Sequence, residues 1–234
     1  MRPFLGYSRA LIVTAVEIER STVLAGLGIS AGSPEASAGA LEDGAPIVVV
    51  AAGVGPAAAA AVTAQFTTMA MHEGAPFGVV LSAGIAGGFA GRVEIGGLVV
   101  ATESIAADLG AAGPDGFQGV DELGFGVTRH DADPGLLRTL RQAFPEAVGG
   151  PVLTVSTVTG TAASKEAVQK RHPDAVAEAM EGFGVAVGAR LWPGTAFGEL
   201  RTISNAVGPR DRAAWRIPQA LDTLREAFAA IASR

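Results

Sequence analysis

Short apolar runs alternate along the chain with longer segments of helical composition. Six runs are nearly continuous in hydrophobic residues, as strands buried on both faces are. We expect strands at Ala10–Val16, Ile47–Ala52, Gly78–Ala83, Leu98–Thr102, Val152–Ser156 and Gly198–Ser204. We expect helices at Ile18–Gly26, Pro56–His72, Pro134–Phe144, Ser164–Arg171, Asp174–Ala189 and Arg212–Ala232.

This alternation of strands and helices is typical of an α/β fold. We predict a three-layer sandwich, in which helices flank a central mixed, mostly parallel sheet, within a single domain over residues 1–234. Two intervening segments, 30–45 and 107–126, are rich in Gly, Ala, Ser, Pro and Asp and are interpreted as loops. The second is long enough to act as a lid or a binding loop.

Composition narrows the chemistry. Of the 234 residues, 49% are hydrophobic and 17% are charged, which suits one large globular domain. The net charge of −6 and the scattered arginines argue against a nucleic-acid partner. The chain has no cysteine, which excludes thiolate catalysis, and its three histidines show no metal-ligand spacing, so we expect no metal site. No cofactor is expected either.

No apolar run has the length of a membrane-spanning helix. The apolar stretch that begins at Ala10 is shorter than a secretory signal requires and ends at Glu17. We therefore expect a cytoplasmic protein without membrane association.

Polar residues and glycines follow three of the predicted strands. Glu17 and Glu19 follow the first, Gly84-Ile-Ala-Gly-Gly88 follows the third, and Asn205 follows the last. In open α/β sheets, ligands bind beyond the carboxyl ends of the strands. The sequence therefore predicts that these segments converge on one binding site.

The two carboxylates after the first strand allow two interpretations. Glu17 and Glu19 could complement the dipole at the start of a helix. Alternatively, one of them could be a general base that activates water. Because they are two residues apart, we expect them to point in different directions.

The Gly-rich segments Gly53-Val-Gly55 and Gly84–Gly88 are interpreted as turns after strands. Glycine in such turns permits positive φ and a close approach of the backbone to a ligand. Neither segment fits a dinucleotide-binding motif, so that ligand class is not supported.

Glu181 and Asn205 are also open to more than one interpretation. Glu181 falls on the predicted helix Asp174–Ala189 and has no cationic residue three or four positions ahead, so it is either a surface carboxylate or a site residue. An apolar stripe is expected to pack this helix, formed by Val176, Met180, Phe183 and Val187. Asn205 precedes Gly208-Pro209 and could be a simple turn residue.

Four stretches, taken together and in order, resemble the purine nucleosidase and nucleoside phosphorylase family over nearly the whole chain. They are Ala15-Val-Glu-Ile-Glu19, Ser82-Ala-Gly-Ile-Ala-Gly-Gly-Phe89, Pro173-Asp-Ala-Val-Ala-Glu-Ala-Met-Glu181 and Leu200-Arg-Thr-Ile-Ser-Asn205. The resemblance implies that Glu19 is the general base and that Glu181 accepts hydrogen bonds from the ribose 2′- and 3′-hydroxyls. It places Met180 under the sugar. The remaining substrate contacts that it implies are Ile85, Ala86, Gly87, Val158 and Thr159.

Two departures from family patterns bear on the reaction. Phosphorolytic relatives hold phosphate with hydroxyl and Arg groups near the Gly-rich turn, whereas Ile85 supplies neither, which favours water as the nucleophile. Adenine-cleaving relatives carry Asp where this chain has Asn205. Asn can accept a hydrogen bond from a protonated N7 and donate its NH₂ to a 6-oxo group, which favours hypoxanthine or guanine over adenine.

Within the family, Ala83–Phe89 together with Ile203–Asp211 and Trp215 is most similar to the futalosine hydrolase branch. This resemblance implies hydrolysis of futalosine to hypoxanthine and dehypoxanthine futalosine in menaquinone biosynthesis. The alternatives are an adenine-releasing nucleosidase of methylthioadenosine or adenosylhomocysteine, a purine nucleoside phosphorylase, and a non-catalytic nucleoside-binding protein. A mere binding protein has no need of both Glu19 and Glu181.

The partner expected from these residues is a small nucleoside. The family further implies a homo-oligomer, a dimer or a dimer of dimers. The residue that would bind the substrate carboxylate is open among Arg20, Arg92, Arg129 and Arg210. Whether Glu17 shares the role of Glu19 is open as well.

Overall fold

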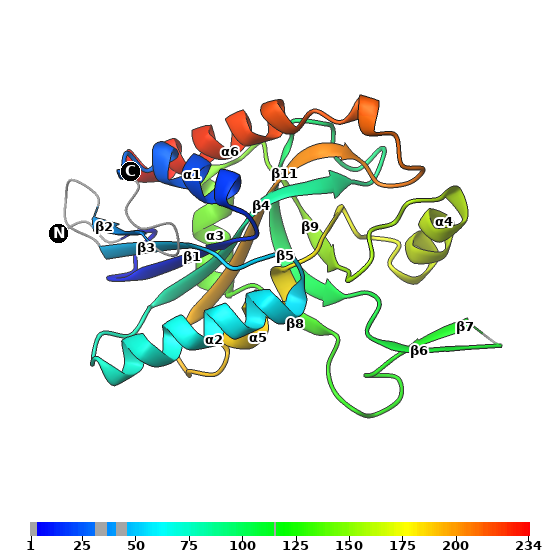
Figure 1. Cartoon of the computed structure of the whole chain (residues 1–234), viewed down its shortest axis with the longest axis horizontal. Coiled ribbons are helices and arrows are strands. Elements are labelled where there is room, and N and C mark those ends of the chain that lie inside the picture. The colour runs from blue at the N-terminus through cyan, green and yellow to red at the C-terminus, as the bar shows by residue number, and fades with distance from the viewer. Residues whose placement is uncertain (1–3, 31–36, 41–45, 115) are drawn as a thin grey trace.

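A mixed sheet of nine strands runs through the centre of the computed structural model, which describes residues 4–30, 37–40, 46–114 and 116–234 (Figure 1). The strand order is β10-β9-β5-β11-β4-β1-β3-β2, and β8 pairs with β5. The strands are β1 (Ala10–Thr14), β2 (Ser37–Ala40), β3 (Pro46–Ala51), β4 (Val79–Gly88), β5 (Leu98–Ala106), β8 (Arg129–Asp131), β9 (Val148–Thr154), β10 (Ala177–Ala179) and β11 (Ala196–Ala206).

Helices cover both sides of this sheet (Figure 1). The helices are α1 (Glu17–Gly26), α2 (Pro56–His72), α3 (Pro134–Ala143), α4 (Ala162–Arg171), α5 (Gly182–Ala189) and α6 (Ile217–Ala232). Helices α1 and α6 pack together on one side, and α2 and α5 pack together on the other. None of these described helices combines the length and the apolarity that a membrane crossing requires.

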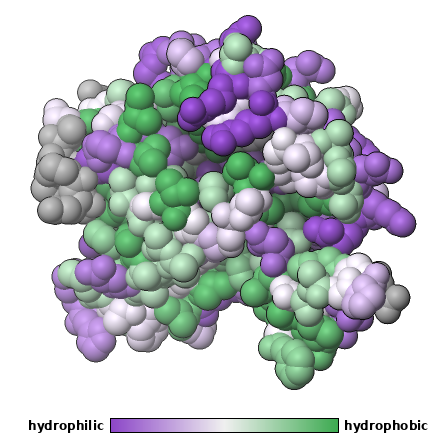
Figure 2. All heavy atoms as spheres, turned by 45° about the vertical axis from the view of Figure 1, so that its right-hand side comes forward, coloured by the Kyte–Doolittle hydropathy of each residue, from purple (hydrophilic) through white to green (hydrophobic). Residues whose placement is uncertain are grey.

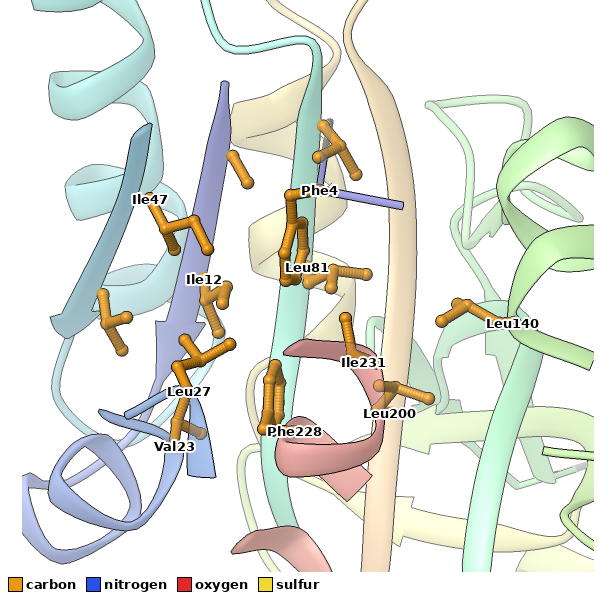
Figure 3. Packing of buried hydrophobic residues seen from close by; sticks show 14 of the residues in the cluster. Phe4, Ile12, Val23, Leu27, Ile47, Leu81, Leu140, Leu200, Phe228 and Ile231 are labelled. Atoms are coloured by element: carbon orange, nitrogen blue, oxygen red, sulfur yellow. The ribbon is translucent and has the colours of Figure 1, made fainter. Parts of the chain in front are cut away.

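Alternate residues of the central strands pack into two separate hydrophobic cores, one on each side of the sheet. Ile12 and Leu81 pack with Phe228 of α6 on one side of the sheet (Figure 3). Leu11, the neighbour of Ile12, packs with Val185 of α5 on the other side. Because successive strand residues point to opposite faces, a strand buried on both faces needs a continuous apolar run. Full burial of each such side chain contributes about 1.5–3 kcal/mol.

The sheet closes on itself at one end. Strand β10 pairs in parallel with β9 and antiparallel with β4, so β4, β11, β5, β9 and β10 form a ring. The predicted α/β fold, with a mixed central sheet flanked by helices, is confirmed. The flat three-layer arrangement is confirmed only in part, because the ring curls one half of the sheet.

The predicted helix Asp174–Ala189 is wrong over its first half. Residues Ala177–Ala179 form β10, and the helix begins only at Gly182. Backbone pairing of β10 with two neighbours outweighs the weak helical preference of this Ala-rich stretch. The predicted stripe fails with it, since Val176 and Met180 precede the helix and Val187 is 38% exposed.

Other boundaries also move. The segment Gly84–Gly88, expected as a turn, continues β4 as strand. The last helix begins at Ile217 rather than Arg212, because Pro218 has no N–H to donate and fits only the first turn. A 3₁₀ turn at Arg212–Ala214 precedes it.

Both predicted loops contain strands. Within 107–126, β6 (Gly110–Gly113) and β7 (Gly116–Gly119) form a separate two-stranded sheet that projects from the body (Figure 1). Within 30–45, residues 37–40 form β2, while 31–36 and 41–45 lie outside the described residues.

Candidate active site

Glu19 is held in the interior where β1 passes into α1. It is only 3% exposed. Its Oε2 accepts hydrogen bonds from the backbone N–H groups of Ala15, at 2.9 Å, and Val16, at 3.2 Å. Its Oε1 accepts one from the N–H of Ile85 on β4, at 2.9 Å. The carboxylate is therefore fixed against the sheet and remains an acceptor.

Glu17 faces away from this position. Its side chain is 53% exposed, and its Oε1 lies 2.7 Å from Arg20 Nη1. The two-residue spacing thus separates the exposed side chain of Glu17 from the buried carboxylate of Glu19, as expected for residues that leave a strand in different directions.

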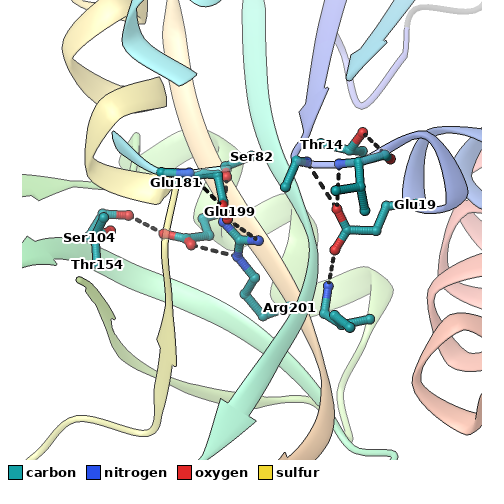
Figure 4. Close-up of polar contacts among 12 residues, drawn as sticks. Thr14, Glu19, Ser82, Ser104, Thr154, Glu181, Glu199 and Arg201 are labelled. Atoms are coloured by element: carbon teal, nitrogen blue, oxygen red, sulfur yellow. Dashed lines mark hydrogen bonds and ion pairs between the residues drawn. The ribbon is translucent and has the colours of Figure 1, made fainter. Parts of the chain in front are cut away.

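Arg201 organises the middle of the site and is 1% exposed. Its Nε donates to Glu199 Oε1 at 2.8 Å, its Nη2 donates to Ser82 Oγ at 2.8 Å, and its Nη1 donates to Glu181 Oε2 at 3.4 Å (Figure 4). Glu181 also accepts a hydrogen bond from the N–H of Gly55 at 3.2 Å. Glu181 is therefore a buried, oriented carboxylate directly before the first residue of α5, rather than a surface residue.

The site carries more negative than positive charge. Three buried carboxylates, those of Glu19, Glu181 and Glu199, surround the single guanidinium of Arg201, and Glu199 also accepts the hydroxyl hydrogen of Ser104 (Figure 4). Burial alone would lower the pKa of Arg201, but Glu199 and Glu181 raise it above its usual value, so it stays charged. Such a centre suits a cation that develops nearby.

The same surroundings shift the pKa of Glu19. Burial raises the pKa of the Glu19 carboxyl and the charge of Glu181 adds to this, while backbone hydrogen bonds and Arg201 oppose it. A carboxylate with a raised pKa is a stronger proton acceptor, and its pKa lies closer to the working pH, where general-base catalysis is most efficient.

Because Gly84 has no side chain, the side chains of Glu19 and Arg201 can both lie close to β4 at this position. A Cβ at this position would lie 2.5 Å from Glu19 Oε1 and 3.0 Å from Arg201 Nη1. The close approach at Gly84 is to side chains of the protein itself, and the approach to a ligand expected of the Gly-rich segment stays a prediction. By contrast, the positive φ expected of the glycines occurs at Gly53, at 92°, and Gly55, at 99°.

A cavity of about 260 Å³ lies farther along β4. Gly84 and Gly87 are three residues apart, which is roughly 10 Å along a strand. The walls of the cavity come from β4, β10, β11, the segment after β11, and the loops that carry Ile95, Val158 and Thr159. Its residues include Gly87, Ile95, Val158, Thr159, Glu178, Asn205, Arg210 and Trp215.

Asn205 presents a defined amide to this cavity. Its Nδ2 donates to the carbonyl of Ala206 at 3.1 Å, and its Oδ1 accepts from the Ser204 hydroxyl at 2.8 Å. Because a carbonyl can only accept, the contact with Ala206 fixes which end of the amide carries the nitrogen. One N–H and one lone pair of Asn205 remain for a ligand.

The predicted residues fall into two groups beside β4. Glu19, Ile85 and Glu181 lie around Arg201, whereas Gly87, Val158, Thr159 and Asn205 line the cavity. The side chain of Ala86 belongs to a hydrophobic cluster, and its carbonyl, at 3.2 Å, shares the single hydroxyl hydrogen of Ser204 with Asn205 Oδ1. Met180 is half-buried between β10 and Glu181.

Three charged residues had no assigned role in the sequence interpretation: Glu178, Glu199 and Arg201. A signal for the last two was present, because Gly198-Glu-Leu-Arg201 carries a carboxylate and a guanidinium on one face of an otherwise apolar strand. Charges in such a position are paired, since burying an isolated charge is costly.

Among the four arginines proposed for a substrate carboxylate, Arg210 lines the cavity. Its guanidinium lies 5.7 Å from the ring of Trp215. The others contact different parts of the chain: Arg20 the Val49 carbonyl, Arg92 the Pro173 carbonyl, and Arg129 the Glu103 carboxylate.

Comparison with known proteins gives a consistent result. The phosphorylase superfamily matches residues 10–234. The chain is 49% identical to a futalosine hydrolase of Streptomyces coelicolor, over 95% of this chain and 94% of that protein. It is 45% identical to a futalosine hydrolase of Acidothermus cellulolyticus, over 95% of this chain and 90% of that protein. The structure of a futalosine hydrolase of Helicobacter pylori superposes with a TM-score of 0.79 at 18% identity, covering 97% of both chains.

Proposed function

This chain belongs to the phosphorylase superfamily, and from that premise we propose that it hydrolyses the N-glycosidic bond of futalosine, releasing hypoxanthine and dehypoxanthine futalosine. The observation that carries the proposal is its identity of 45–49% to two futalosine hydrolases over nearly the full length of each chain. As implied for that branch, the products serve menaquinone biosynthesis.

Glu19 is the general base in this proposal. As the C1′–N9 bond breaks, its electron pair moves to the purine and positive charge grows on the sugar. A water oxygen bonds to C1′ while Glu19 accepts one of its protons. General-base assistance of this kind is worth roughly 10²–10⁴ in rate. The buried, fixed carboxylate beside Ile85 supports this role.

Glu181 holds the ribose. Its Oε1 and Oε2 are oriented by Gly55 and Arg201, and the remaining lone pairs accept from the 2′- and 3′-hydroxyls. Met180 packs under the sugar. The excess negative charge around Arg201 stabilises the cationic sugar more than the neutral substrate, which is what lowers the barrier.

Asn205 receives the leaving base. An amide cannot release a proton to N7, so N7 takes its proton from solvent, and the lone pair of Asn205 Oδ1 accepts a hydrogen bond from N7–H. The free N–H of Asn205 donates to O6 of hypoxanthine. Overall, the proton that Glu19 takes from water balances the proton that the base gains.

Arg210 is the arginine that we propose for the carboxylate of the substrate tail, because it lines the cavity. A location in the cytoplasm remains a prediction.

A homo-oligomer also remains a prediction, and an apolar surface supports it. Val54, Leu109 and Val187 are 56%, 44% and 38% exposed. Leu109 lines a second cavity together with Phe183 and Val187 of α5. Figure 2 shows hydrophobic residues exposed among hydrophilic ones on one face of the molecule. Light scattering of the purified protein and of Val187→Glu tests this surface, because the variant should shift towards monomer.

The decisive assay incubates the purified protein with futalosine, inosine and methylthioadenosine, each with and without phosphate, and identifies the released base. We expect hypoxanthine from futalosine at a rate independent of phosphate. A requirement for phosphate would indicate a phosphorylase instead. Faster release of adenine from methylthioadenosine would indicate the adenine-releasing nucleosidase. Tight nucleoside binding without turnover would indicate a binding protein.

A further inference from the structure

Glu178 and Asn205 are paired with the same residue of the central strand. In the register of β10 with β4, Glu178 stands opposite Gly87, and in the register of β11 with β4, Asn205 stands opposite Gly87. Both also line the same cavity. The glycine between them has no side chain, and a Cβ there would lie 3.3 Å from Asn205 Nδ2. Gly87 therefore places no side chain between the amide of Asn205 and the carboxylate of Glu178.

The carboxylate of Glu178 is buried in an unusual way. The residue is 6% exposed, yet among the described residues no Lys, Arg or His nitrogen forms an ion pair with it. Thr159 donates twice: its N–H reaches Glu178 Oε1 at 2.8 Å, and its hydroxyl donates to Oε2. Each carboxylate oxygen therefore has one protein donor and retains a lone pair.

A buried carboxylate without a cation is costly to keep. Burial raises the pKa of Glu178, whereas the two hydrogen bonds from Thr159 lower it. The proposed reaction of Glu19, Glu181 and Asn205 makes no use of this residue. A ligand that brings an N–H to the free lone pairs would account for its position.

We infer that Glu178 reads the six-membered ring of the base by accepting a hydrogen bond from N1–H of a 6-oxopurine. The inference rests on the proposed function and deepens it. A 6-oxopurine presents an acceptor at O6 beside a donor at N1. The cavity offers the complementary pair, a donor on Asn205 and an acceptor on Glu178. A 6-aminopurine reverses both groups, so its N1 lone pair would face the carboxylate and its amino group would face the Asn205 N–H.

This makes Glu178 a specificity-determining residue separate from Asn205. An unmatched buried polar contact that involves a charged group costs about 1.5–3 kcal/mol, which is roughly 10- to 100-fold in affinity. Thr159 is then a positioning residue, since its two donors aim the carboxylate across Gly87.

The test measures dissociation constants of hypoxanthine, 1-methylhypoxanthine and adenine by calorimetry, on wild type, Glu178→Gln and the exposed control Glu166→Gln. Wild type should bind hypoxanthine about tenfold or more tightly than 1-methylhypoxanthine, which lacks N1–H. Glu178→Gln should lower the ratio of hypoxanthine to adenine affinity about tenfold or more, because its amide can donate to N1 of adenine. Glu166→Gln should leave that ratio at the wild-type value. The ratio is taken within one variant, so a partly unfolded sample does not change it.

The outcomes separate this inference from the proposed function. If wild type cleaves futalosine but Glu178→Gln keeps the wild-type base ratio, or if N1-methylation costs no affinity, Glu178 is not the reader and the proposed function stands. If wild type fails to release hypoxanthine from futalosine, the proposed function itself falls, and the inference with it.

Discussion

Arg201 Nη1 lies 3.4 Å from Glu181 Oε2, although the two residues come from β11 and from the start of α5. Arg201 also donates hydrogen bonds to Glu199 and Ser82, so the group that orients Glu181 is itself held by two further contacts. Buried charges that are individually costly are kept here in a fixed arrangement, which is what a site that stabilises a cation requires.

Glu181→Gln should lower kcat sharply, because an amide has no charge to offset the positive sugar. It should also reduce the preference of the enzyme for ribose over 2′-deoxyribose substrates, since that preference depends on hydrogen bonds from the sugar hydroxyls to the carboxylate. Steady-state kinetics on matched ribo and deoxyribo nucleosides provide the measurement, with Glu166→Gln as the control. Equal wild-type rates on the two sugars would remove Glu181 from the ribose site.

Glu19→Gln should lower kcat by roughly 10²-fold or more while KM changes little, because only the help given in the transition state is lost. Glu17→Gln is the matched control, since Glu17 begins the same helix but is 53% exposed on its side chain. It should keep near-wild-type activity. A Glu19→Gln enzyme that retains more than about a tenth of kcat would place the base elsewhere.

The pH profile should show an acidic limb that Glu19 sets. Protonated Glu19 cannot accept a proton from water, and burial raises its pKa above 4.5, so kcat/KM should fall as the pH is lowered through a midpoint above that value. The residual activity of Glu19→Gln should lack this limb. Because the pKa of Glu178 is raised as well and its carboxylate is proposed to bind the base, Glu178→Gln removes any limb that Glu178 sets and should retain the one set by Glu19. A limb that is unchanged in Glu19→Gln but lost in Glu178→Gln would reassign it.

Asn205→Asp should shift base preference towards 6-aminopurines. The new carboxylate would meet O6 of hypoxanthine with an acceptor and would accept from the 6-amino group of adenine. A mismatch of this kind costs about 1–3 kcal/mol, or roughly 10- to 100-fold in kcat/KM. Rates on futalosine and its 6-amino analogue test this. The assignment of Asn205 fails if wild type prefers the amino compound, or if the variant keeps the original preference.

Gly84→Ala should damage catalysis at a position that carries no functional group. The added methyl would lie 2.5 Å from Glu19 Oε1, so either the carboxylate or β4 must shift. We expect kcat to fall about tenfold or more, since a displacement near 1 Å at a reacting centre can cost 10²-fold. Gly126→Ala, whose nearest neighbour would be 3.8 Å away, is the control. Full activity of Gly84→Ala would show that Glu19 tolerates displacement.

Much of the fold could be predicted from the local pattern of hydrophobic residues. The continuous apolar runs at β1, β3 and β4 predicted strands buried on both faces, because each such strand has no polar side to show to water. The pairing of Ala177–Ala179 was not accessible, because a three-residue strand between two partners has no periodicity of its own. The error placed Glu181 in the middle of a helix rather than at its start.

By itself, the sequence determined the family resemblance, the order of the motifs and the chemical identity of the groups: a carboxylate at position 19, another at 181 and an amide at 205. Only the tertiary structure decided which groups meet. It buried Glu19 and exposed Glu17, paired Arg201 with Glu181, and brought Glu178 and Asn205 to either side of Gly87. These contacts join residues that are distant in sequence, and they depend on strand register and on the closure of the ring, which no local pattern encodes.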